Sequence, residues 1–183
     1  MKIFILKEQS LNERRVSLVP DVAKKLINDG FEVFIESSAG DYSNFSDDQY
    51  SSVGAKIGDL ETFLPDCDIV LSVKMPDIEI IKKMKSEACL IGLLNPYDNH
   101  DQLKTLSENN INAFSMELVP RSPRAQSMDV LSSQSNLAGY KAIVDSSSMF
   151  NRAMPMMMTA AGTIAPAKIF IMGVGVAGLQ AIA

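Results

Sequence analysis

The sequence has little of what acid–base, nucleophilic or metal chemistry requires. It contains one histidine, His100, and two cysteines, Cys67 and Cys89, in 183 residues. His100 follows Asn95–Asn99, a stretch typical of a turn, so we expect it at the surface. The cysteines lie in or beside apolar runs without the spacing of metal ligands, which indicates buried, reduced thiols. The sequence therefore offers no metal site and no evident set of acid, base and nucleophile.

Long apolar runs and clusters of positive charge are also missing. No stretch approaches the roughly 18 apolar residues of a membrane helix. The first residues, Met1–Lys7, are too short and too soon charged for a signal peptide. A formal charge of -5 argues against a nucleic-acid partner. With 46% hydrophobic and 21% charged residues, the composition is that of a globular protein. We expect a soluble cytoplasmic polypeptide that can still dock on a membrane partner.

Short apolar runs alternate with helical segments in the first two thirds of the chain. Strands are expected at Lys2–Lys7, Phe31–Glu36, Ile69–Val73, Cys89–Leu94 and Ile111–Met116. Helices are expected between them, at Pro20–Asn28, Ser46–Val53, Ile78–Met84 and Asp101–Glu108. This alternation predicts an α/β fold, a flavodoxin-like parallel sheet with helices on both faces. We assign this N-terminal α/β domain to residues 1–125.

The character of the sequence changes at the proline-stiffened loop Pro120–Arg124. From Gln126 to Phe150 the only strong helix breaker is Gly139, which favours a long linking helix. About 25 helical residues would span roughly 37 Å. A proline precedes and a glycine follows Met156–Ala161, so a short second helix is expected there. Residues 126–165 are thus predicted to form an interdomain helical segment.

An apolar run, Ala167–Met172, leads directly into a glycine-rich turn, and Leu179–Ala183 is then typical of a helix start. The turn reads Gly173-Val174-Gly175-Val176-Ala177-Gly178. In a G-x-G-x-x-G between strand and helix, the first glycine allows a tight turn. The second lets the backbone approach a diphosphate, and the third permits close packing. A glycine turn without a ligand is the alternative. We predict a dinucleotide site in residues 166–183, the first βα unit of a Rossmann domain.

The chain ends five residues after Gly178. The acidic residue that binds the adenosine ribose is expected about 20 residues beyond the motif. A lone βα unit cannot bury both of its faces. We therefore expect the NAD(H)-binding domain to be truncated here, the residues after the linking segment to be poorly ordered, and this chain alone to be inactive.

The segment between the two domains carries a set of polar side chains. If Gln126 opens a helix, polar residues recur every three or four positions on one face; these are Gln126, Asp129, Ser132 or Ser133, and Asn136. Arg121 and Arg124 lead into that face. Such donors and acceptors suit a carboxamide and ribose hydroxyls. The alternative is an ordinary capped helix start in which Arg121 and Asp129 are merely paired, and periodicity alone does not decide between the two.

Three stretches, Arg121–Tyr140, Pro155–Gly162 and Gly173–Ile182, resemble the NAD(H)-binding component, domain I, of nicotinamide nucleotide transhydrogenases. The opening, Lys7-Glu8 with Glu13–Pro20, resembles the N-terminal domain which that family shares with alanine dehydrogenase. The resemblance implies an oxidoreductase that transfers hydride directly between NAD(H) and NADP(H) and translocates protons. It further implies a homodimer, an NADP(H)-binding partner domain and a membrane-embedded partner, with this chain peripheral on the cytoplasmic side of the inner membrane.

The resemblance also implies roles for individual residues. Arg121 matches the residue that contacts the nicotinamide carboxamide, and Gln126 matches one that touches the nicotinamide ribose and faces the NADP(H) component. Asp129 and Ser132 match polar residues that orient the nicotinamide. The phosphate loop is matched by Gly173, Gly175, Val176 and Gly178. No side chain need act as acid or base, because positioning alone can supply roughly 7–11 kcal/mol of a barrier.

Two other functions are considered. In alanine dehydrogenase an arginine and a lysine bind pyruvate, and Arg15 and Lys74 occupy the matching places. The histidine that donates a proton there has no counterpart near Leu94-Asn95, although imino-acid reduction needs a proton to accompany the hydride. The other possibility is a non-catalytic remnant that folds as the N-terminal domain and only dimerises.

Overall fold

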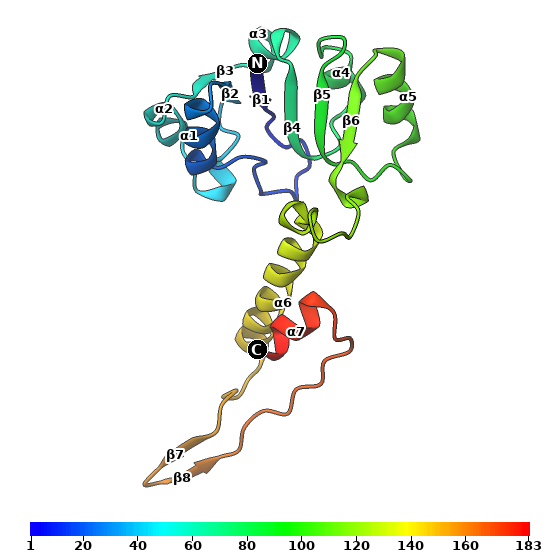
Figure 1. The fold of residues 1–183 in the computed structure, drawn as a ribbon. Coiled ribbons are helices and arrows are strands. Elements are labelled where there is room, and N and C mark those ends of the chain that lie inside the picture. Colours follow the sequence, from blue (N-terminus) through cyan, green and yellow to red (C-terminus); the bar gives the residue numbers. More distant parts are fainter. The chain divides into compact units, whose positions relative to one another are not determined.

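The structure is a computed structural model that describes all 183 residues. The chain divides into two compact units, Met1–Pro120 and Arg121–Ala183 (Figure 1). No helix in either unit combines the length and the apolar character that a membrane crossing requires.

The first unit is built on a six-stranded parallel sheet. Its strands are β1 (Lys2–Ile5), β2 (Glu32–Glu36), β3 (Lys56–Gly58), β4 (Ile69–Lys74), β5 (Cys89–Leu93) and β6 (Asn112–Ser115). Their order is β3-β2-β1-β4-β5-β6. Without β3 this is the flavodoxin order, and those five strands are the ones expected from the sequence. The sequence does not reveal β3 because three residues are too few for a periodic pattern; β3 extends the edge by pairing Ile57 with Ile35 of β2.

Helices connect the strands: α1 (Pro20–Asn28), α2 (Asp47–Ser52), α3 (Leu60–Phe63), α4 (Ile78–Ile81) and α5 (His100–Glu108). Short 3-10 turns are η1 (Asp41–Ser43), η2 (Leu64–Asp66) and η3 (Met116–Leu118). Local sequence explains the helix starts. Pro20 opens α1, and Ser46 and Gln49 form a reciprocal capping box at α2. His100 is exposed at the start of α5, which confirms its predicted surface position.

Alternate residues of the sheet fill two separate cores. On one face Phe4, Val70 and Leu90 pack with residues of α4 and α5. On the other face Ile3, Ile5 and Val33 pack with α1 and α2. Tyr50 of α2 is fully buried there, and its hydroxyl donates a 2.7 Å hydrogen bond to the carbonyl of Leu18. Burial raises the pKa of Tyr50 to about 12.

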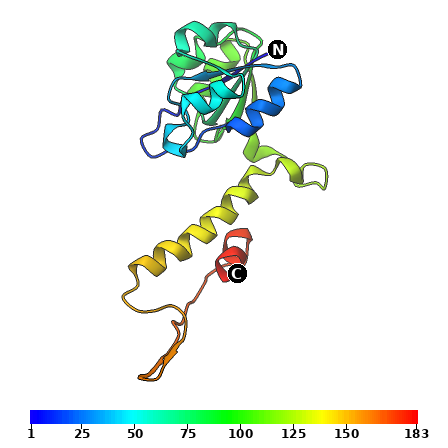
Figure 2. The same cartoon turned by 90° about the vertical axis from the view of Figure 1, so that its left-hand side faces the viewer.

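The second unit contains η4 (Gln126–Met128), α6 (Val130–Met149), β7 (Met157–Thr159), β8 (Gly162–Ile164) and α7 (Val176–Ile182) (Figure 2). The long helix is confirmed, but α6 begins at Val130 rather than at Gln126, because Asp129 caps it. The helix expected at Met156–Ala161 is wrong. Its residues instead form an antiparallel hairpin, β7 with β8, in which Gly162 adopts a φ of 140° beyond the two-residue loop.

The strand expected at Ala167–Met172 is also wrong. These residues have no regular structure, whereas the helix after the glycines, α7, does form. A strand requires a neighbour for its backbone hydrogen bonds, and the only strands of the second unit pair with each other. The βα unit assigned to residues 166–183 is therefore present in its turn and helix but not in its strand.

Candidate functional site

Asp129 organises the start of α6. Its Oδ1 accepts a 2.9 Å hydrogen bond from the backbone N of Ser132, and its Oδ2 accepts a 2.6 Å bond from the Ser132 hydroxyl. These bonds from Ser132, with the positive charge of Arg121, hold the pKa of Asp129 below its usual range. Asp129 and Ser132 thus form an ionised, rigid pair. The capping role raised as an alternative is present, but no ion pair joins Asp129 to Arg121.

Gln126 and Arg121 lie before the helix. Gln126 belongs to η4, where its backbone N donates to the carbonyl of Ser122 and its carbonyl accepts from the backbone N of Asp129. The expectation that Gln126 shares a helical face with Asp129 is therefore wrong, because the helix starts four residues later. Both side chains are exposed, and the Gln126 amide makes no hydrogen bond within the chain. They are accessible to a ligand beside the Asp129–Ser132 pair.

The glycine loop adopts the tight turn that its sequence predicts. Gly173 has a φ of 101°, and a Cβ added to Gly178 would lie 2.0 Å from the carbonyl oxygen of Gly173. A side chain at Gly178 would therefore displace the loop. Gly175 caps α7, accepting from the backbone N of Leu179, and a Cβ at Gly175 would meet nothing within 4 Å. Val176 is the first residue of α7, so all four predicted loop residues lie in this turn.

Close packing of α6 against α7 brings the two groups of predicted site residues together (Figure 2). A Cβ added to Gly139 of α6 would lie 2.1 Å from the carbonyl oxygen of Ala177 in α7. One turn closer to the start of α6, the Asn136 amide donates a 3.0 Å hydrogen bond to Gln180 Oε1. Asn136 follows Ser132 by one further turn. Sequence reasoning treats Gly139 only as a weak point of the helix, and therefore misses the contact that joins the two groups.

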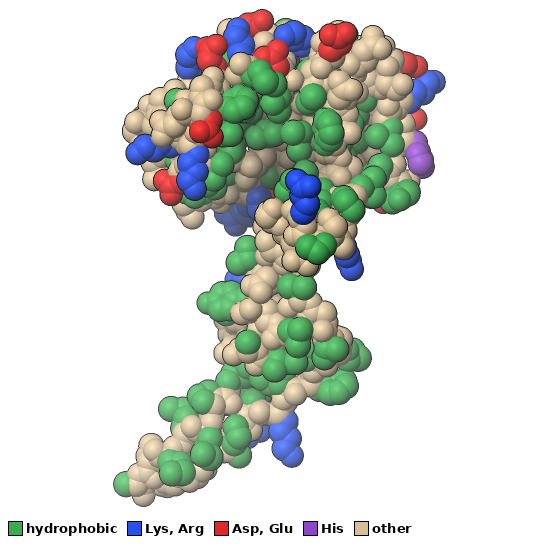
Figure 3. All heavy atoms as spheres, in the orientation of Figure 1, with side chains coloured by type: hydrophobic (Ala, Val, Ile, Leu, Met, Phe, Trp, Pro, Cys, Tyr) green, Lys and Arg blue, Asp and Glu red, His purple; other side chains and the backbone are tan.

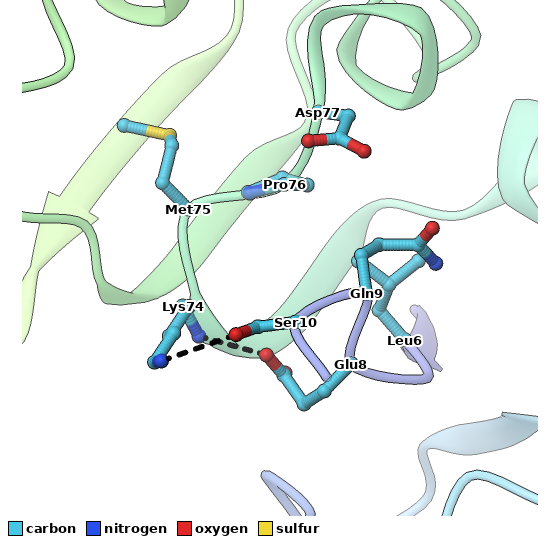
Figure 4. A pocket seen from close by; sticks show the side chains of 8 residues that line it. All are labelled: Leu6, Glu8, Gln9, Ser10, Lys74, Met75, Pro76 and Asp77. Atoms are coloured by element: carbon cyan, nitrogen blue, oxygen red, sulfur yellow. Dashed lines mark hydrogen bonds between the residues drawn. The ribbon is translucent and has the colours of Figure 1, made fainter. Parts of the chain in front are cut away.

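The residues relevant to an alanine dehydrogenase also come together, in the first unit. The Glu13 side chain is 6% exposed and accepts two 2.7 Å bonds, from Arg15 Nε and Nη2. Lys74 Nζ lies 3.7 Å from Glu13 Oε2. Glu8 accepts hydrogen bonds from the backbone N of Val73 and of Lys74. Figure 4 shows Glu8, Ser10 and Lys74 around a small cavity of about 170 Å³. Both cations are thus already close to an internal carboxylate.

Replacing Glu13 with glutamine is expected to lower stability in a pH-dependent way. The hydrogen bonds from Arg15 hold the pKa of Glu13 at about 2, below its ordinary 4.5. A depressed pKa contributes stability that is fully present above the ordinary value and is lost as the pH falls toward 2. We expect Glu13→Gln to cost about 2–3 kcal/mol at neutral pH and less at acid pH.

Urea unfolding as a function of pH measures this effect. Glu79→Gln, which removes an exposed ion pair with Lys82, is the matched control and is expected to leave the pH profile unchanged. An equal loss of stability in Glu13→Gln at neutral and acid pH would show that the carboxylate charge has no part in it.

Comparison with known proteins assigns both portions of the chain. Residues 4–138 match the family described as "Alanine dehydrogenase/PNT, N-terminal domain", and residues 142–183 match "Alanine dehydrogenase/PNT, C-terminal domain". The first of the polypeptides that make up NAD(P) transhydrogenase subunit alpha in Rickettsia prowazekii is 45% identical over 188 residues, and that of Rhodospirillum rubrum is 46% identical over 192. Each alignment covers 100% of this chain and 49% of the relative, so the chain spans about half the length of these relatives.

Solved structures agree. The transhydrogenase from Sinorhizobium meliloti superposes with a TM-score of 0.95 at 46% identity, covering 100% of this chain and 55% of that one. An L-alanine dehydrogenase gives a TM-score of 0.84 at 25% identity, covering 100% of this chain and 51% of that one. Similarity is thus higher to the transhydrogenases than to the alanine dehydrogenase. The chain belongs to the alanine dehydrogenase/PNT family.

Proposed function

We propose that this chain is the NAD(H)-binding component of a proton-translocating NAD(P) transhydrogenase, in which hydride passes directly between NAD(H) and NADP(H). The observation that carries this proposal is the packing of α6 on α7, which joins the Asp129–Ser132 pair to the glycine loop. The two features are suited to the two ends of one dinucleotide. The names of the relatives that are 45–46% identical support the same function.

Each predicted site residue has a role in this proposal. Bound NADH supplies the hydride. Arg121 holds the nicotinamide carboxamide, and Gln126 contacts the nicotinamide ribose. Asp129 and Ser132 fix the orientation of the ring. The diphosphate lies against the loop residues Gly173, Gly175, Val176 and Gly178. Because direct transfer needs no proton relay, alignment of the two nicotinamides is the whole task of the protein.

The proposal includes the assembly. NADP(H) is bound by a partner domain that faces Gln126, and a membrane-embedded partner carries the protons. The chain acts as a homodimer that is peripheral on the cytoplasmic side of the inner membrane. The relatives are named as one portion of a subunit alpha, which is consistent with a role as one component among several.

NADH titration tests the proposal. The protein to use is a chimera in which residues 1–183 continue into the half of the Rhodospirillum rubrum relative that this chain does not match. We expect the chimera to bind NADH and the 183-residue chain to bind it weakly or not at all. Arg121→Ala is expected to weaken NADH binding by about 10- to 100-fold, since a hydrogen bond to a charged group contributes about 1.5–3 kcal/mol.

Arg124→Ala is the matched control, because Arg124 is an exposed arginine of the same loop. It is expected to bind NADH as the unsubstituted chimera does. No NADH binding by a folded chimera, or equal losses in the two arginine variants, would contradict the proposed site.

The convergence of Arg15 and Lys74 on Glu13 favours alanine dehydrogenase as a second candidate. Against it, the place near Leu94-Asn95 holds no histidine, and His100 is exposed on α5. Oxidation of L-alanine with NAD by the chimera would select this second function. NADH binding without that activity would support the first.

A further inference from the structure

Half of one face of the first unit's sheet has no helix over it. In Figure 1 α1 and α2 lie beside β1, β2 and β3, and nothing from the first unit lies in front of β4, β5 and β6. The side chains on that half alternate with buried residues of the opposite face; they are Ile69, Leu71, Cys89, Ile91, Leu93 and Phe114. We call this set the open face.

Every member of the open face is accessible although most are strongly apolar. Phe114 is 55% exposed, in contrast to the burial usual for a phenylalanine in a parallel sheet, and the other members are half-buried. Cys89, Ile91, Leu93 and Phe114 belong to neither core cluster. In the space-filling view, hydrophobic side chains gather on this side of the first unit (Figure 3). Strands of one parallel sheet rarely leave such a face in water.

The path of the chain explains why this half is open. Right-handed crossovers from β1 through β3 put α1 and α2 on one face, and those from β3 to β6 put α3, α4 and α5 on the other. Closing the remaining half requires one more helix, next to α1. After β6 the first unit continues only into the short turn η3 and ends at Pro120. The helix that covers the open face therefore lies outside residues 1–120.

The open face calls for a helix rather than a strand. Backbone groups of β4 and β5 are satisfied by neighbouring strands on both sides, so the face offers side chains and not hydrogen bonds. No charged side chain belongs to it. The complementary surface is the apolar stripe of an amphipathic helix. Phe114, at the edge, offers an aromatic anchor of the kind that dominates binding energy at interfaces.

We propose that the open face binds an amphipathic helix belonging to the half of the relatives that this chain does not match. That half is about as long as this chain, because the alignments cover 49% of each relative. The α/β domain would then be built from two separated segments of a full-length polypeptide. This proposal concerns only the first unit and is independent of the dinucleotide site.

The two free cysteines test it. Cys89 belongs to the open face and is partly accessible, whereas Cys67 is 1% exposed in the opposite core. The chimera that continues into the second half of the Rhodospirillum rubrum relative is compared with the 183-residue chain. Maleimide labelling of each cysteine is followed by peptide mass spectrometry. We expect Cys89 labelling in the chimera to be slower by about 10-fold or more, and Cys67 to stay protected in both.

Variants separate a specific contact from a general change. In the chimera, Leu93→Asp is expected to restore labelling of Cys89, and Leu11→Asp, at a fully exposed loop position, is expected to leave it slow. Protection of Cys67 in each variant shows that the core is intact. Equal labelling of Cys89 in chimera and chain would overturn the proposal. So would protection of Cys89 in the 183-residue chain that increases with its concentration, because a second copy would then be the occupant. NADH binding by the chimera is measured separately, so failure of one proposal does not imply failure of the other.

Discussion

Gly139→Val is expected to detach α7 from α6 and to abolish NADH binding by the chimera. A Cβ at this position would lie 2.1 Å from the carbonyl oxygen of Ala177, a distance that no rotamer relieves because both atoms are fixed by backbone. The helices must separate. Since α7 has only seven residues, it cannot persist without that contact, because isolated helices shorter than about 12–15 residues are marginal in water.

Hydrogen exchange of the α7 amides in the 183-residue chain measures the loss directly. We expect these amides to exchange about 100-fold faster in Gly139→Val, which corresponds to about 2.7 kcal/mol. Ala138→Val adds the same branched side chain at the neighbouring exposed position of α6, and it is expected to change exchange in α7 little. Unchanged exchange in Gly139→Val would show that α7 does not depend on α6.

Asp129→Ala is expected to lower the rate of hydride transfer by about 100-fold in the assembled enzyme, with a smaller effect on NADH affinity. The substitution removes both acceptors that fix Ser132, and small displacements of a reacting ring can cost about that factor. Asp129→Asn, which retains one carbonyl acceptor for the Ser132 backbone N, is expected to keep more of the rate.

Single-turnover transfer from bound NADH to an NADP analogue on the partner component measures this step. Ser133→Ala is the control, since the Ser133 hydroxyl only donates to the carbonyl of Val130. A rate that is unchanged in Asp129→Ala while NADH affinity falls would make Asp129 a binding residue without a role in alignment.

The first unit was predictable because its strands are long enough to show their burial. In β1, Ile3, Phe4 and Ile5 are all buried since helices cover both faces, and such apolar runs bounded by turns are typical of parallel sheets. The exception is instructive. Phe114 has the residue type of a core position, but its exposure depends on whether a helix lies over β6, and local sequence holds no information on that.

The second unit was less predictable because its elements depend on partners. Met157–Thr159 has no helix-breaking residue, yet it pairs with β8 once Gly162 permits the turn. Ala167–Met172 has a strand-like sequence but no strand beside it. Of the candidate site, the local features were foreseen: the Asp129 cap and the glycine turn. The contact at Gly139 was not, because it joins residues nearly forty positions apart in sequence.

The placement of β1 in the sheet has a consequence for how the protein is made. Lys2–Ile5 leaves the ribosome first, yet β1 lies between β2 and β4 and pairs Ile3 with both Val33 and Ile69. Its second neighbour is synthesised more than sixty residues later, so the middle of the sheet cannot close until that neighbour emerges. During that interval the nascent chain carries one apolar strand edge without its partner, which makes this the stage of synthesis at which a chaperone has most to bind.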